Sequence, residues 1–183
     1  MKRSLFILVV VAVAAVSILG AMLVTASPTP AAPTAAPPLS QQEADDLQFA
    51  REEEKLARDV YSFLDGVWGG QIGLFANIAV SEDTHTLAIR DLLKKYRVDD
   101  PAKHDVPGEF VNEVLQHEYD HLVVEGSASL LAALEVGVYI EEMDIIDLTL
   151  FQGRTTHRDI ERVYGNLIDG SWSHLASFEK ALE

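Results

Sequence analysis

The chain has 183 residues, enough for one ordinary domain with appendages, and 48% of them are apolar, which is sufficient for a packed core. Its 29 acidic and 14 basic residues give a formal net charge of −15. That charge argues against nucleic acid as a partner, because phosphate contacts need a basic face. The absence of cysteine excludes disulfides, thiolate sites and iron–sulfur clusters, so any metal must be held by His, Asp and Glu.

Residues 1–25 predict either a cleaved signal peptide or an N-terminal transmembrane anchor. Lys2 and Arg3 precede an uncharged run from Leu5 to Val24, which is long for a signal peptide and, at about 20 residues, just long enough to span a bilayer. The basic end is expected to stay cytoplasmic. We therefore expect an exported protein, either secreted or held in the cell envelope, that contacts the membrane only through this segment.

Residues 26–39 contain five of the seven prolines, with Ala and Thr between them. This composition is typical of a stiff, extended linker without a core. The linker separates the N-terminal segment from the predicted globular domain, residues 40–183.

The globular domain is predicted to be all-α. Ser40 and Glu43 fit a capping box that begins a first helix, and Gly66 is expected to end it. Thr156 and Asp159 are expected to cap the last helix. No alternating run typical of a strand is found. The expected helices span residues 40–65, 71–96, 109–124, 127–153 and 156–183.

The lengths of the connections predict how the helices are arranged. The first two long helices, and the last two, are joined by only a few residues, so each pair should be antiparallel neighbours. The link between the pairs, roughly 30 residues with one short helix, is long enough to cross the bundle. This connectivity predicts a ferritin-like four-helix bundle with a long crossover that carries a short extra helix.

Each long helix has a core-facing stripe, and every stripe is apolar except near its middle. The interruptions are Glu54, then Glu82 with His85, then Glu141, and finally His174. Buried unpaired carboxylates cost several kcal/mol each, and a cation is the usual remedy. Glu-x-x-His facing glutamates of neighbouring helices is how bundle cores bind two iron or manganese ions.

The predicted positions of these residues along the bundle axis, their heights, agree only in part. Glu141 lies 12 residues before Gly153, whereas His174 lies 18 residues after Thr156, so the two would sit at different levels. The stripe of the third long helix is also expected to begin with a buried Leu131.

The same residues carry a family resemblance. Glu54 to Tyr61 resembles the Glu-x-x-Ala-Arg-x-x-Tyr of the first rubrerythrin helix, and Glu82-x-x-His85 is similar to that family's second-helix motif. Residues 40–183 most closely resemble the DUF2202 group of uncharacterised ferritin-like proteins, through segments 136–145 and 166–178. The resemblance implies di-metal ligands at Glu54, Glu82, His85, Glu141 and His174.

The chain departs from this pattern in its last helix, where Ser171 stands three residues before His174 in place of a glutamate. One bridging carboxylate is therefore missing. Either Glu142 or Asp144 could compensate, or the site holds one metal ion or none. The cysteine-rich iron module of rubrerythrins is also absent, so their electron-transfer route is not implied.

A competing motif lies on the short helix, where His117, Glu118 and His121 spell His-Glu-x-x-His. In zinc peptidases the two histidines bind zinc and the glutamate is the general base, and Glu141 follows at the spacing of a third ligand. The peptidase needs an edge strand for its substrate, and none is predicted. The other interpretations are a solvated helix face or an accessory surface metal site. His104 and His157 are expected to be exposed in loops.

These patterns predict a ferritin-like protein that binds one or two iron or manganese ions. With an open coordination position, such a site could oxidise Fe(II) or reduce peroxide or oxygen. The alternative from another class is a non-catalytic module that binds metal or a partner, and a homo-oligomer is left open.

Overall fold

The computed structural model describes residues 38–183. The predicted signal or anchor, residues 1–25, and nearly all of the predicted linker lie outside the described residues. The described part contains five helices and no strand, which confirms the all-helical prediction. They are α1 (Gln41–Trp68), α2 (Leu74–Tyr96), α3 (Glu113–Gly126), α4 (Leu130–Arg154) and α5 (Arg158–Leu182). Across residues 38–183, no helix combines the length and apolar character that crossing a membrane requires.

The first helix begins as predicted but ends later. The Ser40 hydroxyl accepts a hydrogen bond from the Glu43 N–H, and the Glu43 carboxylate accepts one from the Ser40 N–H, which completes the capping box. Gly66 does not end the helix. It continues to Trp68, whose indole N–H donates to the carbonyl of Gly126 at 2.9 Å and so fixes the last turn to α3.

The other four helices all start later than predicted, α2 and α4 by three residues each. Helix α3 begins four residues later than expected, because the side chain of Asn112 caps it by accepting from the N–H groups of Val114 and Leu115. Helix α5 has His157 at its N-cap position, without a side-chain cap bond, instead of the expected cap by Thr156 and Asp159. The Asp159 carboxylate instead binds Lys95 of α2.

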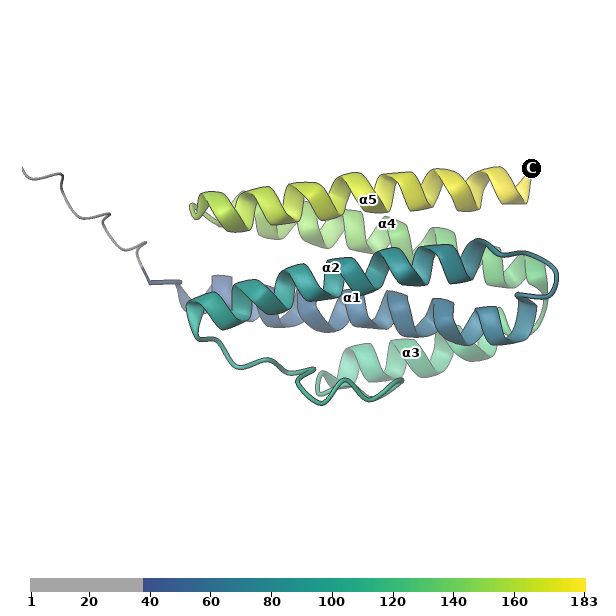
Figure 1. Ribbon diagram of the computed structural model, residues 1–183, viewed down its shortest axis with the longest axis horizontal. Coiled ribbons are helices and arrows are strands. Elements are labelled where there is room, and N and C mark those ends of the chain that lie inside the picture. Colours follow the sequence, from purple (N-terminus) through teal and green to yellow (C-terminus); the bar gives the residue numbers. More distant parts are fainter. Residues whose placement is uncertain (1–37) are drawn as a thin grey trace, which may run out of the picture. The chain divides into compact units, whose positions relative to one another are not determined.

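The four long helices form a bundle. The turns at residues 69–73 and 155–157 join α1 to α2 and α4 to α5 as neighbouring pairs. Contacts of α1 with α4 and of α2 with α5 close the bundle, and α3 packs on the outside against α1 and α4 (Figure 1). The segment between the pairs, residues 97–129, therefore carries the short extra helix, as predicted.

The apolar core of the bundle is divided into two halves. One half includes Val60, Leu64, Phe75, Ile140 and Phe178. The other half includes Leu47, Ile89, Leu148, Ile160 and Leu167. All four long helices contribute to both halves, and between the halves each helix carries buried polar side chains. The predicted interruptions of the stripes therefore form one polar layer across the bundle.

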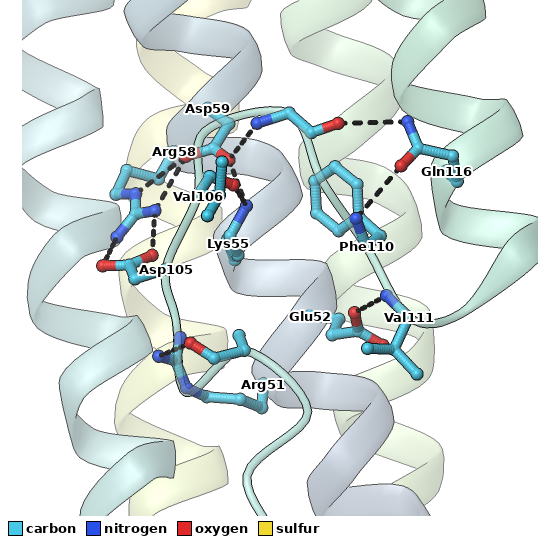
Figure 2. Close-up of polar contacts among 12 residues, drawn as sticks. Arg51, Glu52, Lys55, Arg58, Asp59, Asp105, Val106, Phe110, Val111 and Gln116 are labelled. Carbon is cyan, nitrogen blue, oxygen red and sulfur yellow. Dashed lines mark hydrogen bonds and ion pairs between the residues drawn. The ribbon is translucent and has the colours of Figure 1, made fainter.

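Helix α1 is buried on two sides at the level of this layer. The loop between α2 and α3 crosses its outer face, where Lys55 Nζ donates to the Val106 carbonyl at 2.8 Å and to Asp59 at 2.5 Å (Figure 2). The Glu52 carboxylate accepts from the Val111 N–H at 2.5 Å (Figure 2). Every residue from 51 to 55 is consequently buried, although only one of them belongs to the predicted stripe.

Candidate metal centre

The polar layer brings together all five residues predicted as ligands. Each is more than nine-tenths buried, and together they come from all four long helices. They are Glu54 of α1, Glu82 and His85 of α2, Glu141 of α4 and His174 of α5. The convergence of the stripes on one layer is therefore as the sequence predicts.

The shared carboxylate of Glu82 divides the layer into two half-sites. Its Oε2 lies 2.9 Å from Nδ1 of His85, which is also 3.1 Å from Oε2 of Glu54. Its Oε1 lies 2.6 Å from Nδ1 of His174, which is also 3.5 Å from Oε2 of Glu141. Within each half-site, one oxygen or nitrogen atom from each of the three residues lies within 4.8 Å of the others. Each half-site thus offers two carboxylates and one imidazole.

Neighbouring side chains hold these groups in place. The Tyr61 hydroxyl donates to Oε1 of Glu141 at 2.6 Å, and Oγ of Ser81 lies 2.9 Å from Nε2 of His174. Gly170 leaves room for the other imidazole, because a Cβ there would lie only 2.6 Å from Nε2 of His85. The two imidazole rings stack with centroids 5.6 Å apart. Such outer contacts fix the orientation of metal ligands.

The two acids suggested as replacements for the missing carboxylate differ in burial. Glu142 is exposed, whereas Asp144 is 4% exposed and points into the layer. The Ser171 hydroxyl donates a hydrogen bond to the Asp144 carboxylate. Asp144 lies outside both half-sites but adds a fourth carboxylate to the layer. Its spacing of three from Glu141 repeats that of Glu82 and His85, a pattern that is visible in the sequence.

Burial and mutual repulsion favour protons on several of these acids. Burial, followed by the charges of Asp144 and Glu82, raises the pKa of Glu54 well above its usual range. Burial also raises the pKa of Asp144 to about 8, although the hydrogen bond from Ser171 opposes this, and raises that of Glu141 to about 6. Within residues 38–183, Oε1 of Glu54 and Oδ1 of Asp144 are buried without a hydrogen-bond partner.

The histidines and Glu82 stabilise one another in their charged forms. Burial alone would raise the pKa of Glu82, but hydrogen bonds from His174 and His85 lower it to about 2. Burial would lower the pKa of both imidazoles, yet the facing carboxylates raise it, to about 9 for His174. Several groups of the layer therefore hold protons, and a bound cation could displace these protons.

The competing His-Glu-x-x-His motif does not assemble a site. His117 and His121 are both exposed on α3, and Glu141, the expected third ligand, points into the central layer instead. Among residues 38–183, the two half-sites are the only groups of three or more potential ligands close enough to share an ion.

The prediction that His157 is exposed in a loop was wrong. It is 6% exposed because its Nδ1 lies 2.9 Å from the Glu43 carboxylate.

Sequence reasoning missed two polar residues of this region. Ser81 lies off the stripe of α2 and reaches His174 across the bundle, a contact that only the packing of α2 against α5 creates. Glu53 precedes Glu54 but points to the side of α1 facing Asp144 and Asp147. It is 8% exposed. No pattern within α1 indicates its burial, because residues distant in the sequence cover it.

The described part of the chain is thus an all-helical bundle with a buried carboxylate–histidine cluster. It belongs to the DUF2202 family, described as an uncharacterised protein domain, which matches residues 43–183. A curated relative, the uncharacterised protein MJ0754 of Methanocaldococcus jannaschii, is 46% identical over 145 residues, covering 79% of this chain and 77% of the relative. The crystal structure of hypothetical protein MJ0754 from Methanococcus jannaschii DSM 2661 matches with a TM-score of 0.78 and 43% identity, covering 81% and 83% of the two chains.

Proposed function

We propose that this chain is an exported ferritin-like protein whose central layer binds two iron or manganese ions and uses them in oxidase- or peroxidase-type chemistry. The observation that carries the proposal is the pair of half-sites that share Glu82. Each offers two hard oxygen donors and one imidazole, a donor set that suits iron and manganese. The bundle of two antiparallel pairs with a long connection supports the ferritin-like assignment.

The charge of the layer fits two divalent ions. Glu54, Glu82, Glu141 and Asp144 supply four negative charges when ionised, which equal the four positive charges of two divalent cations. Asp144 therefore completes the charge that Ser171 cannot supply. The buried oxygens without hydrogen-bond partners, on Glu54 and Asp144, are the kind of atom that a cation satisfies.

The surrounding residues would orient the ligands and limit access of water. Bound iron or manganese would supply Lewis-acid and one-electron chemistry. Tyr61 holds the Glu141 carboxylate, Ser81 fixes the imidazole of His174, and the apolar half-cores exclude water on both sides of the layer. His85 and His174 are each 8% exposed, so their edges offer the nearest approach for a small oxidant.

A second function is favoured by the contacts within the layer itself. The imidazoles pair with Glu82, Tyr61 binds Glu141 and Ser171 binds Asp144, so most of the buried polar atoms are satisfied by protein groups. The same layer could serve a non-catalytic module, in which the polar network fixes the alignment of the four helices. The two functions differ in whether metal binding stabilises the fold.

The test is a set of thermal melts with chelator, with Mn(II), and with Fe(II) under anaerobic conditions. An ion at a hundredfold excess over its dissociation constant stabilises the native state by about 2.7 kcal/mol, or roughly 5–11 °C for a domain of this size. We expect this shift in the wild type and in His117→Ala, which removes an exposed histidine of the competing motif, and not in His85→Ala. Oxygen consumption with Fe(II) then tests the oxidase chemistry.

A wild-type midpoint that neither metal moves would remove the metal site and leave the structural module. A shift abolished by His117→Ala but retained by His85→Ala would place the metal on α3 and revive the surface or zinc interpretation.

A further inference from the structure

The two half-sites differ in how they draw on the two helix pairs. The first half-site consists of Glu54, Glu82 and His85, which all belong to the pair of α1 and α2. The second half-site takes Glu82 from α2, but it takes Glu141 and His174 from the other pair, α4 and α5. The first half-site is therefore complete within one helix pair, whereas the second exists only where the two pairs pack together.

The two pairs meet on two sides of the bundle, and these sides are not equivalent. The helices of each pair pack extensively on one another, while contacts of α1 with α4 and of α2 with α5 are fewer. On the α1–α4 side, α3 contacts both helices and so connects the two pairs (Figure 1). Among the helices of residues 38–183, none covers the α2–α5 side in the same way. The α2–α5 side is thus the side on which the pairs can separate.

The polar contacts of His174 lie across this α2–α5 side. Its Nδ1 lies 2.6 Å from Oε1 of Glu82, and its Nε2 lies 2.9 Å from Oγ of Ser81, so both ring nitrogens contact α2. His85, in contrast, is held within its own pair, because its Nδ1 lies 3.1 Å from Glu54 and 2.9 Å from Glu82. Separation of α2 from α5 would break the second half-site and leave the first one assembled.

We propose that the second half-site is a clasp: its occupancy by a divalent cation holds the α2–α5 side of the bundle closed, after the first half-site has filled. This inference rests on the proposed metal binding. A ligand shifts an equilibrium between two conformations only if its affinity for them differs. The first half-site is available whether the pairs are packed or separated, so it fills first and does not favour closure. It also fixes the shared Glu82, which the second half-site needs.

The experiment measures amide hydrogen exchange by mass spectrometry in the full 183-residue chain, kept in mild detergent, with chelator and with Mn(II). Exchange of buried amides in α2 and α5 reports how often this side of the bundle opens. Calorimetric titration with Mn(II) gives the number of bound ions. The variants are His174→Ala and Glu141→Gln, which each remove a ligand of the second half-site and leave the first complete. Ser173→Ala is the matched control, because it changes an exposed residue next to His174.

An ion that binds only the closed bundle, at a hundredfold excess over its dissociation constant, lowers the open fraction about a hundredfold. We expect exchange in α2 and α5 to slow by this factor in the wild type and in Ser173→Ala, each with two ions bound. His174→Ala and Glu141→Gln should each bind one ion without slowing this exchange. Using two variants guards against misfolding of one, which circular dichroism would reveal.

Two kinds of result would overturn the clasp. One is a wild type that binds a single ion, or binds two ions without a change in exchange. The other is a folded variant that binds no ion, or that shows the full slowing of the wild type. A wild type that binds no Mn(II), or binds it equally after His85→Ala, is a different outcome, because the metal centre itself would then have failed.

Discussion

Replacement of Gly170 by alanine tests whether the imidazole of His85 is held where the structure places it. A Cβ at position 170 would lie 2.6 Å from Nε2 and 2.7 Å from Cε1 of His85, closer than real Cβ atoms approach other atoms. The ring cannot yield freely, because its Nδ1 faces two carboxylates and its face stacks on His174. Gly170→Ala should therefore turn His85 away from Glu54 and Glu82.

Two opposing free energies decide the size of the effect. Alanine in place of glycine within a helix stabilises by about 0.5–1 kcal/mol. Loss of the hydrogen bonds of the charged His85, of which the one to ionised Glu82 is the strongest, costs about 1.5–3 kcal/mol. The net result is a destabilisation of about 0.5–2.5 kcal/mol, which lowers the melting temperature of the metal-free protein by roughly 1–10 °C. Metal affinity should fall about 10–100-fold, the usual effect of disturbing a ligand's support.

The assay compares melts of Gly170→Ala with those of Gly66→Ala, each with chelator and with Mn(II). Gly66 is the control because it is helical and a Cβ there would meet nothing within 4 Å. Gly66→Ala should stabilise slightly and keep the full metal shift. A Gly170→Ala protein that is as stable as the control and binds Mn(II) as tightly would refute the assigned position of His85.

Two further predictions concern the acids and the domain boundary. The pKa of Asp144 is about 8 in the folded protein against 3.8 for an ordinary aspartate, so the stability of the metal-free protein should fall as pH rises from about 4 to 8. Asp144→Asn removes this loss of stability. Denaturant titrations with chelator should therefore show the variant more stable than wild type at pH 8, with the difference vanishing near pH 4. An equal difference at both pH values would contradict the burial argument. A chain that starts at Ser40 should melt as cooperatively as the full chain by circular dichroism, because residues 1–39 are expected to add nothing to the core; loss of folding would place the boundary elsewhere.

The periodicity of the sequence predicted the helices and the residues that each of the four long helices contributes to the site. It did not predict how the residues of α4 and α5 meet. Glu141 lies 13 residues before the end of α4 and His174 lies 16 residues after the start of α5, about 20 and 24 Å along their helices. Side chains lean toward the N-terminus of their own helix. Because α4 and α5 are antiparallel, the carboxylate lies farther from the connecting turn than its Cα, and the imidazole lies nearer to it. The difference in height that the sequence suggests is thereby reduced, and the imidazole of His174 lies 3.5 Å from the Glu141 carboxylate.

Other features could not be predicted because they depend on contacts between distant segments. Leu131 is 58% exposed, contrary to prediction, since α4 is apolar on its outer face as well, at Ile146 and Leu150, and its stripe is ambiguous. Glu53 faces Asp144 and Asp147 of α4, and the burial of His157 depends on Glu43. Local pattern gave no indication of either.

The protons held by the polar layer have a consequence for how the protein exchanges ions. The raised pKa values of Glu54, Asp144, His85 and His174 favour the protonated form of each group, whereas hydrogen bonds from the two histidines favour the ionised form of Glu82. Ligands must be deprotonated to bind a metal ion, so loading the layer with divalent cations would expel protons from these groups. Uptake of metal would then be an exchange of cations for protons: the surrounding medium is acidified, and the heat of binding depends on which buffer takes up the released protons.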